Sequence, residues 1–322
     1  MSLTLLSLAE IKHCITMAQA VDTMEMAFKQ LANKQVELPL RTPVLIEKEK
    51  ALCLTMPAYL KEQDALGLKV VSIFPNNQTK NKPVINGAIL LLDAQTGEVR
   101  AMMDAGYLTA LRTGAVSGVA TKYLAKPDAE HVAIIGSGIQ AQTQLEAVAT
   151  VRNIKRVSIW SRNKEKAEAF AKRIRAHYEV QTYNELSDAV KEADIICTAT
   201  ASTEPLIHLA DLKPLVHINA IGSHSLAMRE IANDVMAQAL VVVDQLDAAL
   251  AEPGEVVSAI EHKMLQEASI QELGNLIREP KQHRGKITVF KSVGLAIQDI
   301  SIAQVVYQNA KAKHCGTSFE LS

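Results

Sequence analysis

Cysteine and aromatic residues are scarce in this sequence. Four of the 322 residues are cysteine, and Phe, Trp and Tyr together make up 4%. The cysteines form no C-x-x-C pair, and their wide spacing indicates neither a disulfide framework nor a zinc site. We therefore expect no bound metal, and we expect the reducing cytoplasm as the location.

Long hydrophobic runs and an excess of one charge are also missing. The longest apolar runs, AILLL and ALVVV, are of strand length, far short of the roughly 20 residues that a membrane-spanning helix needs. The 34 Lys and Arg residues nearly balance the 35 Asp and Glu residues, which argues against nucleic acid or a membrane surface as a partner. No basic segment precedes the first apolar stretch, so a signal peptide is not indicated. We expect a globular protein that binds a small molecule.

The order of predicted strands and helices changes along the chain. A helix is expected over residues 7–33, opened by a capping box of Ser7 and Glu10. Apolar runs then follow one another on short loops, which predicts a largely antiparallel sheet with helices on one side. These expected strands cover residues 42–47, 51–56, 66–73, 88–93 and 98–103.

From His131 onward, apolar strands alternate with helical segments, as in HVAIIG and RVSIWS. This alternation predicts a parallel sheet covered on both faces. The fold class is therefore α/β, a Rossmann-type doubly wound sheet plus an α+β substrate-binding and dimerisation domain. We expect the latter over residues 1–116, completed by 300–322, and the Rossmann domain over 117–299.

A glycine fingerprint for a dinucleotide follows the first strand of this second region. Residues 136–141 read GSGIQA, a G-x-G-x-x-A pattern between a strand and a helix. Gly136 permits the tight turn, Gly138 lets a pyrophosphate approach the backbone, and Ala141 allows close packing of helix and sheet. The first residues of the helix, Ile139 and Gln140, offer free N–H groups to the phosphates.

The end of the next strand bears on the choice between NADP and NAD. It reads Trp160-Ser161-Arg162-Asn163-Lys164, without the carboxylate that binds the ribose 2′-hydroxyl of NAD. Ser161 can donate a hydrogen bond to a 2′-phosphate, and Arg162 can pair with it. NADPH is therefore the predicted cofactor, with NADH as the alternative.

Other residues at strand ends of the second region are expected to line the cofactor crevice, because ligands bind at the carboxyl ends of parallel strands. These residues are Thr198, Thr200, Ala220, Ile221 and Val293. By contrast, His217 lies within a predicted strand and is expected to be a core histidine.

Three cations stand in uncharged surroundings of the first region. They are Arg41 in LPLRTPVLI, Lys69 in ALGLKVVSI and Arg112 in LTALRTGAV. A cation buried among apolar residues needs a partner, and an anionic substrate is one such partner. Their recurrence predicts a pocket for a carboxylate.

These segments together resemble the ornithine cyclodeaminase/mu-crystallin family over almost the whole chain. The motifs that carry the resemblance are LRTPV (40–44), GLKVV (67–71), TALRTGAVSGVATKYLA (109–125), VAIIGSGIQA (132–141), IWSRNKEKAEAFA (159–171), HINAIGSH (217–224) and FKSVG (290–294). The resemblance implies a substrate and dimerisation domain joined to a Rossmann domain. It also implies that Arg41, Lys69 and Arg112 contact the substrate carboxylate.

One position departs from the family pattern. In the family's cyclodeaminases and alanine dehydrogenases an Asp follows the glycines of the segment that here reads AIGSHS, and His224 stands in its place. Histidine can transfer a proton near neutral pH but does not supply a fixed negative charge for an ammonium substrate. The resemblance thus favours reduction of an imine over deamination.

The predicted reaction is NADPH-dependent reduction of a cyclic ketimine carboxylate. The expected substrate is Δ1-pyrroline-2-carboxylate, which would give L-proline, with Δ1-piperideine-2-carboxylate, which would give L-pipecolate, as a close analogue. Lys69 or His224 would supply the proton. Two alternatives stay open: deamination by an ornithine cyclodeaminase or alanine dehydrogenase, and an NADPH-binding protein with little turnover. A homodimer is expected, since a sheet edge in the first region needs covering.

Overall fold

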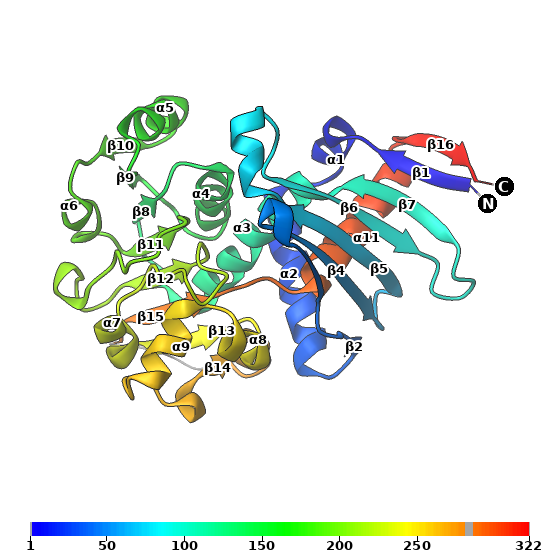
Figure 1. Cartoon of the computed structure of the whole chain (residues 1–322). Helices are drawn as coiled ribbons and strands as arrows, with labels where there is room; N and C mark the ends of the chain where they lie inside the picture. The colour runs from blue at the N-terminus through cyan, green and yellow to red at the C-terminus, as the bar shows by residue number, and fades with distance from the viewer. Residues whose placement is uncertain (1, 281–285, 322) are drawn as a thin grey trace. The chain divides into compact units, whose positions relative to one another are not determined.

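The computed structural model describes residues 2–280 and 286–321 (Figure 1). Its contacts divide the chain into two compact units, Met1–Arg112 with Leu295–Ser322, and Thr113–Gly294. The division between them falls inside helix α3 (Ala105–Leu124). The assignment of substrate binding to 1–116 with 300–322, and of cofactor binding to 117–299, stays a prediction.

The first unit is built on a mostly antiparallel sheet in the order β16-β1-β7-β6-β5-β4-β2, with β3 paired to β4. Only β1 and β7 pair in parallel among its described strands. The strands are β1 (Ser2–Leu6), β2 (Val36–Glu37), β3 (Thr42–Ile46), β4 (Ala51–Leu60), β5 (Ala65–Ile73), β6 (Ile85–Leu92), β7 (Val99–Asp104) and β16 (Thr317–Glu320). The chain ends therefore meet in one sheet, a long-range pairing that the sequence did not reveal.

Helices cover one face of this sheet, as the sequence predicted (Figure 1). The helices are α1 (Leu8–Cys14), α2 (Met17–Ala32) and α11 (Ala296–Ala312). Helix α11 packs against β4, β5 and β6 and also against α2. Because β4 and β5 alternate buried and half-buried residues, their buried side chains form a core with the apolar residues of α2 and α11.

The single helix expected over residues 7–33 is wrong. The capping box of Ser7 and Glu10 opens α1 as predicted, but that helix ends at Cys14 and Ile15 is extended. Thr16 then caps α2 through a second capping box with Gln19. This second S/T-x-x-E/Q pattern is a helix-start signal within the apolar periodicity, and it explains the break.

The second unit contains a parallel sheet in the order β10-β9-β8-β11-β12-β15-β13-β14. Its strands are β8 (His131–Ile135), β9 (Arg156–Trp160), β10 (Glu179–Thr182), β11 (Ile195–Thr198), β12 (His217–Ala220), β13 (Leu240–Val243), β14 (Gln271–Glu272) and β15 (Thr288–Lys291). Its helices are α4 (Ile139–Val151), α5 (Lys164–Ile174), α6 (Leu186–Val190), α7 (Asn233–Gln238), α8 (Leu246–Ala251), α9 (Gly254–Glu261) and α10 (Leu273–Arg278). Crossing helices on both faces make the sheet doubly wound (Figure 1).

Two separate apolar clusters lie on the two faces of this parallel sheet. Along β8, Val132 and Ile134 belong to one cluster, and Ala133 and Ile135 to the other. All four side chains are fully buried, which is the property that makes such strands continuously apolar in sequence. The α/β fold class expected from the sequence is confirmed.

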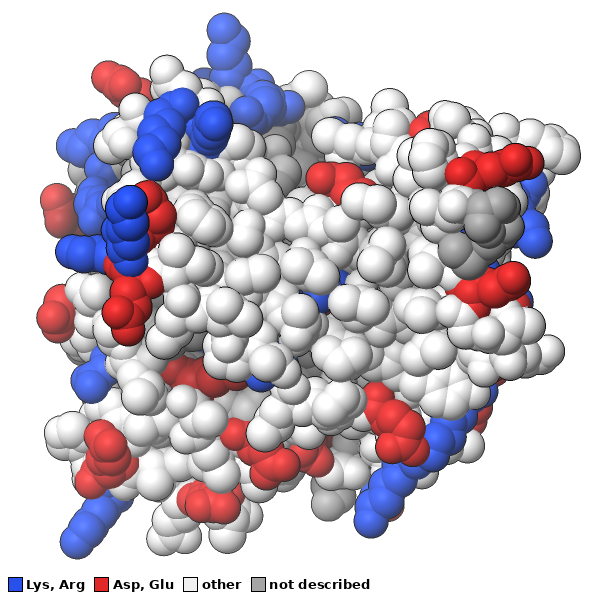
Figure 2. Space-filling model, turned by 45° about the vertical axis from the view of Figure 1, so that its right-hand side comes forward, with Lys and Arg blue, Asp and Glu red and all other residues white. Residues whose placement is uncertain are grey.

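The surface carries charges of both signs. Figure 2 shows Lys and Arg interspersed with Asp and Glu on the surface, among many uncharged residues. Of the helices that the structure describes, none is both long and apolar enough to span a membrane.

Candidate functional site

The glycine fingerprint forms a tight turn between β8 and α4. Gly136 has φ 123°, a conformation that side chains rarely adopt, and an added Cβ would lie 2.6 Å from the Ala199 carbonyl oxygen. The next glycine, Gly138, is the N-cap of α4 and has no side chain to cap the helix. The turn thus leaves the first N–H groups of a 13-residue helix without a side-chain cap.

This turn fits a dinucleotide phosphate. A Cβ added at Gly138 would meet no atom within 4 Å, so the space beside the backbone is open. Ile139 and Gln140 begin the helix, and Ala141 is fully buried in the core beneath it. An open approach to uncapped N–H groups at a helix N-terminus is the arrangement that binds a pyrophosphate.

The end of β9 lies beside this turn. The hydroxyls of Ser137 and Ser161 are 3.0 Å apart and hydrogen-bond to each other. Arg162 and Lys164 are exposed, whereas Asn163 caps α5 by accepting a hydrogen bond from the Lys166 N–H at 2.8 Å. The structure therefore brings Ser161 to the glycine loop and gives Asn163 a structural role.

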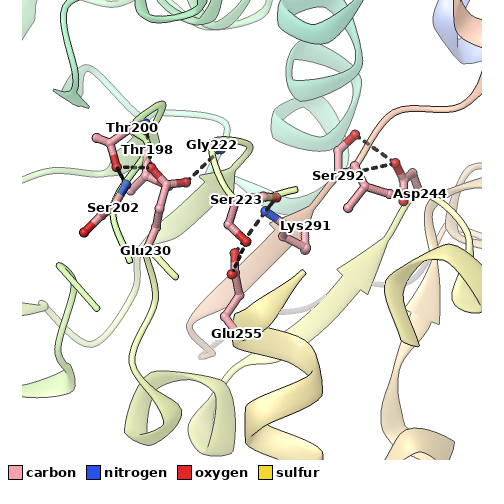
Figure 3. A network of polar contacts seen from close by, with 11 residues as sticks. Thr198, Thr200, Ser202, Gly222, Ser223, Glu230, Asp244, Glu255, Lys291 and Ser292 are labelled. Atoms are coloured by element: carbon pink, nitrogen blue, oxygen red, sulfur yellow. Dashed lines mark hydrogen bonds and ion pairs between the residues drawn. The ribbon is translucent and has the colours of Figure 1, made fainter. Parts of the chain in front are cut away.

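A buried carboxylate that the sequence did not reveal lies at the ends of β11 and β12. It accepts hydrogen bonds from both predicted threonines. Glu230 accepts hydrogen bonds from the Thr198 hydroxyl at 2.8 Å and from the N–H and hydroxyl of Thr200 at 2.7 and 2.8 Å. It also accepts from the Gly222 N–H at 2.7 Å (Figure 3). Glu230 thus links the end of β11, through the two threonines, to the end of β12, through the Gly222 N–H.

The residue at 222 has to be glycine for this contact. An added Cβ would lie 2.2 Å from the Thr200 carbonyl oxygen and 2.5 Å from Glu230 Oε1. Burial raises the pKa of Glu230, an effect that the nearby Lys291 opposes. Ala220 and Ile221, which precede this glycine, are buried.

A second buried cluster adjoins the first (Figure 3). Lys291, the last residue of β15, donates a hydrogen bond to the Ser223 carbonyl at 2.5 Å and forms a 3.0 Å ion pair with Glu255. The Ser223 hydroxyl donates to the other carboxylate oxygen of Glu255. Lys291 and Glu255 are fully buried, so their charges stabilise each other away from water.

A third carboxylate orders the segment after β15. Asp244 accepts hydrogen bonds from the Ser292 hydroxyl and from the N–H groups of Val293 and Gly294, all at 2.8–2.9 Å. The predicted crevice residue Val293 is thus held through its backbone.

In the first unit, two of the predicted substrate cations share one carboxylate. Asp299, in the first turn of α11, accepts hydrogen bonds from Lys69 Nζ at 2.5 Å and from Arg112 Nε at 3.1 Å. Asp299 is fully buried, and Lys69 and Arg112 are 2% and 6% exposed. Two positive charges and one negative charge therefore occupy this buried cluster.

The third predicted cation also acts on this cluster. Burial lowers the pKa of Lys69 from 10.5 to about 8; Asp299 opposes this effect, while the positive charges of Arg112 and Arg41 lower the pKa further. All three cations singled out in the sequence are thus close enough to interact. An anionic carboxylate would offset their mutual repulsion.

A neighbouring amide has an unused donor. Gln298 Oε1 accepts hydrogen bonds from Arg112 at 2.7 Å and from the Leu295 N–H at 2.9 Å. Its Nε2 is buried without a hydrogen-bond partner among the described residues. Buried donors are usually satisfied, so a bound carboxylate or water is the partner that this geometry calls for.

The two histidines of the HINAIGSH segment differ in their environments. His224 is exposed and follows Ser223, which hydrogen-bonds to Lys291 and Glu255. His217 is a core histidine, as predicted, and its ring nitrogens hydrogen-bond to Thr288 and Asn219. Burial lowers the pKa of His217 to about 3, so this ring stays neutral. Over the described residues, no group of three His, Cys, Asp or Glu is arranged to hold a metal.

The comparison with known proteins gives full-length matches. The sequence profile of the ornithine cyclodeaminase/mu-crystallin family matches residues 2–314. A Δ1-pyrroline-2-carboxylate reductase of Bacillus cereus is 37% identical over 322 residues, covering 98% of this chain and 99% of the relative.

Two solved structures are similar in fold as well as in sequence. The Thermococcus litoralis Δ1-pyrroline-2-carboxylate reductase in complex with NADH and L-proline has a TM-score of 0.94 and 36% identity, covering 98% of this chain and 99% of that one. An archaeal alanine dehydrogenase dimer with bound NAD has a TM-score of 0.94 and 31% identity, covering 100% of both chains.

Proposed function

Because the chain belongs to the ornithine cyclodeaminase/mu-crystallin family, we propose that it reduces a cyclic ketimine carboxylate with a nicotinamide cofactor. The substrate is Δ1-pyrroline-2-carboxylate and the product L-proline, with the six-membered analogue converted to L-pipecolate. The observation that carries the proposal is the buried Lys69–Asp299–Arg112 cluster, which has more positive than negative charge. The relatives named for the same reaction support it.

The substrate carboxylate binds at Lys69 and Arg112, with Arg41 contributing charge. Gln298 Nε2 is a further donor for that carboxylate, because it is buried and lacks a partner among the described residues. Asp299 keeps both cations in place without cancelling the charge of the cluster. These residues hold and orient the anion, which is the protein's share of a reaction whose hydride comes from the cofactor.

The cofactor binds at Gly136, Gly138 and the N-terminus of α4, with its 2′-phosphate at Ser161 and Arg162. NADPH is the preferred form, because no carboxylate stands at residues 160–164 to repel a phosphate. The similar structures hold NADH or NAD, so NADH is the form that competes. When bound, the cofactor supplies hydride to the imine carbon, and the imine nitrogen takes a proton from the chain.

His224 or Lys69 supplies that proton. The imine is electrophilic only when its nitrogen is protonated or hydrogen-bonded to an acid. Lys69, with a pKa of about 8, is close to the operating pH of a general acid. His224 is exposed, and it stands where deaminating family members carry an Asp.

Alanine dehydrogenation is the competing function, because the archaeal alanine dehydrogenase has the same TM-score of 0.94 as the reductase structure. One assay separates the two. Purified protein is given NADPH or NADH with Δ1-pyrroline-2-carboxylate, and in parallel NAD with alanine or ornithine. We expect NADPH oxidation with the imine, and neither NAD reduction nor ammonia release with alanine or ornithine. Ammonia release from ornithine or alanine with the imine untouched would contradict imine reduction, and tight NADPH binding without turnover would indicate a binding protein.

The working form is a homodimer. Large apolar side chains of the first unit are exposed: Leu40 (80%), Val44 (57%), Leu45 (72%) and Ile85 (52%). A second copy of the chain would cover them, because exposed apolar groups of this kind mark protein contacts. The alanine dehydrogenase of similar fold is a dimer. The cytoplasm is the proposed location, supported by four free cysteines.

A further inference from the structure

The FKSVG motif contains a buried cation that the proposed reaction does not yet use. Lys291 is fully buried at the end of β15, and so is its partner Glu255 on α9. Burying an ion pair costs desolvation energy, and apolar residues of similar volume are often as stabilising. Such a pair therefore calls for an explanation other than stability.

What the pair holds is the backbone just before His224. Lys291 Nζ donates to the Ser223 carbonyl at 2.5 Å, and the Ser223 hydroxyl donates to Glu255 (Figure 3). One residue earlier, the Gly222 N–H donates to Glu230 at 2.7 Å. Three buried charged side chains from three parts of the unit therefore fix two consecutive residues.

We propose that Lys291, held in place by Glu255, is a positioning residue that fixes the direction in which the exposed His224 leaves the Gly222-Ser223 backbone. The inference rests on the proposed function and takes His224, rather than Lys69, as the group that protonates the imine nitrogen. Proton transfer needs a donor within hydrogen-bond reach of its acceptor. A shift of about 1 Å in such a group can lower the rate about 100-fold.

The test compares variants that remove the pair with one that removes His224. K291M/E255Q removes both charges together, so that neither is left buried alone. We expect kcat with Δ1-pyrroline-2-carboxylate to fall about 10- to 100-fold, with little change in KM, because the carboxylate contacts lie elsewhere. In K291M/E255Q/H224A, kcat should fall no further than in H224A alone, since the pair acts through His224.

A matched control keeps structural damage apart from loss of positioning. Thr288 lies on β15, the strand that also contains Lys291, and hydrogen-bonds to His217. T288V removes this buried hydrogen bond without changing residues 222–224. It should lower Tm and leave kcat unchanged. Should K291M/E255Q not fold, S223A removes the hydroxyl link to Glu255 alone and should lower kcat in the same direction.

The outcomes separate the two hypotheses. An unmodified chain that does not reduce the imine contradicts the proposed function. If the unmodified chain is active, any of three results would contradict the positioning role. These are an unchanged kcat in the pair variants, no effect of H224A on kcat, or losses from the pair and from H224A that multiply.

Discussion

Asp299 offers the most direct perturbation of the proposed carboxylate site. It is the shared partner of Lys69 and Arg112, and all three side chains are buried. Each contact contributes on the order of 5 kcal/mol of Coulomb attraction at an effective dielectric constant of about 20, much of it offset by desolvation. D299N leaves two buried cations without a carboxylate, so we expect a loss of about 3–5 kcal/mol in unfolding free energy.

The same change alters the ionisation of Lys69. Burial lowers its pKa to about 8, and Asp299 is the main influence that raises it. In the unmodified chain, KM for the imine carboxylate should rise as the pH passes through about 8, because Lys69 loses its charge. In D299N that rise should begin at least about one pH unit lower.

The free energy of unfolding should increase over the pH range in which substrate binding weakens. Between about pH 8 and 10.5 the unfolded chain holds the Lys69 proton more tightly than the folded chain does. The contribution of this group to unfolding free energy therefore increases with pH, while substrate binding weakens. K69M should remove both dependences.

The assay is the initial rate of NADPH oxidation against imine concentration on both sides of pH 8, with Tm measured in parallel. D194N is the matched control, because Asp194 is a half-buried carboxylate that pairs with Lys213 and Lys126 in the second unit. It should lower Tm and leave the pH dependence of KM unchanged. A D299N protein whose KM follows the unmodified pH profile would refute the assignment of this cluster to the substrate.

Three further substitutions test the phosphate site, the 2′-phosphate contact and the dimer interface. G136A places a Cβ 2.6 Å from the Ala199 carbonyl oxygen at φ 123°. It should lower the free energy of unfolding by about 1–3 kcal/mol and weaken NADPH binding in a calorimetric titration. An unchanged Kd for NADPH would contradict the phosphate site. R162D should raise KM for NADPH about tenfold or more and leave KM for NADH nearly unchanged; equal effects on both would exclude a 2′-phosphate contact. L45D, at a side chain 72% exposed, should give a monomer by light scattering, and a persistent dimer would place the interface elsewhere.

Local patterns predicted much of the fold. The buried strands of the second unit are continuous apolar runs because both faces are covered, and the glycine turn is specified by its own residues. The capping box at Ser7 was identified for the same reason, since its partners are three residues apart. The second capping box, at Thr16, has the same form and was hidden by an apolar periodicity that runs across it.

Partners distant in sequence could not be predicted. Asp299 lies 230 residues from Lys69 and 187 from Arg112, so no local pattern joins them. The rule that identified the three cations, a charge among apolar residues, also applies to Asp299 in AIQDISIA and to Lys291 in ITVFKSV. Applied to the whole chain, it would have marked both as residues needing a partner, although not which partner.

Isotopic labelling shows whether the hydride of NADPH reaches the imine carbon. NADPH carrying deuterium at nicotinamide C4, on the face from which hydride is transferred, is incubated with the protein and Δ1-pyrroline-2-carboxylate, and the product is examined by mass spectrometry and NMR. We predict L-proline with one deuterium at Cα, formed in equal amount to the NADP+ produced. Proline without deuterium, or no consumption of the imine while ornithine or alanine releases ammonia, would contradict imine reduction by this protein.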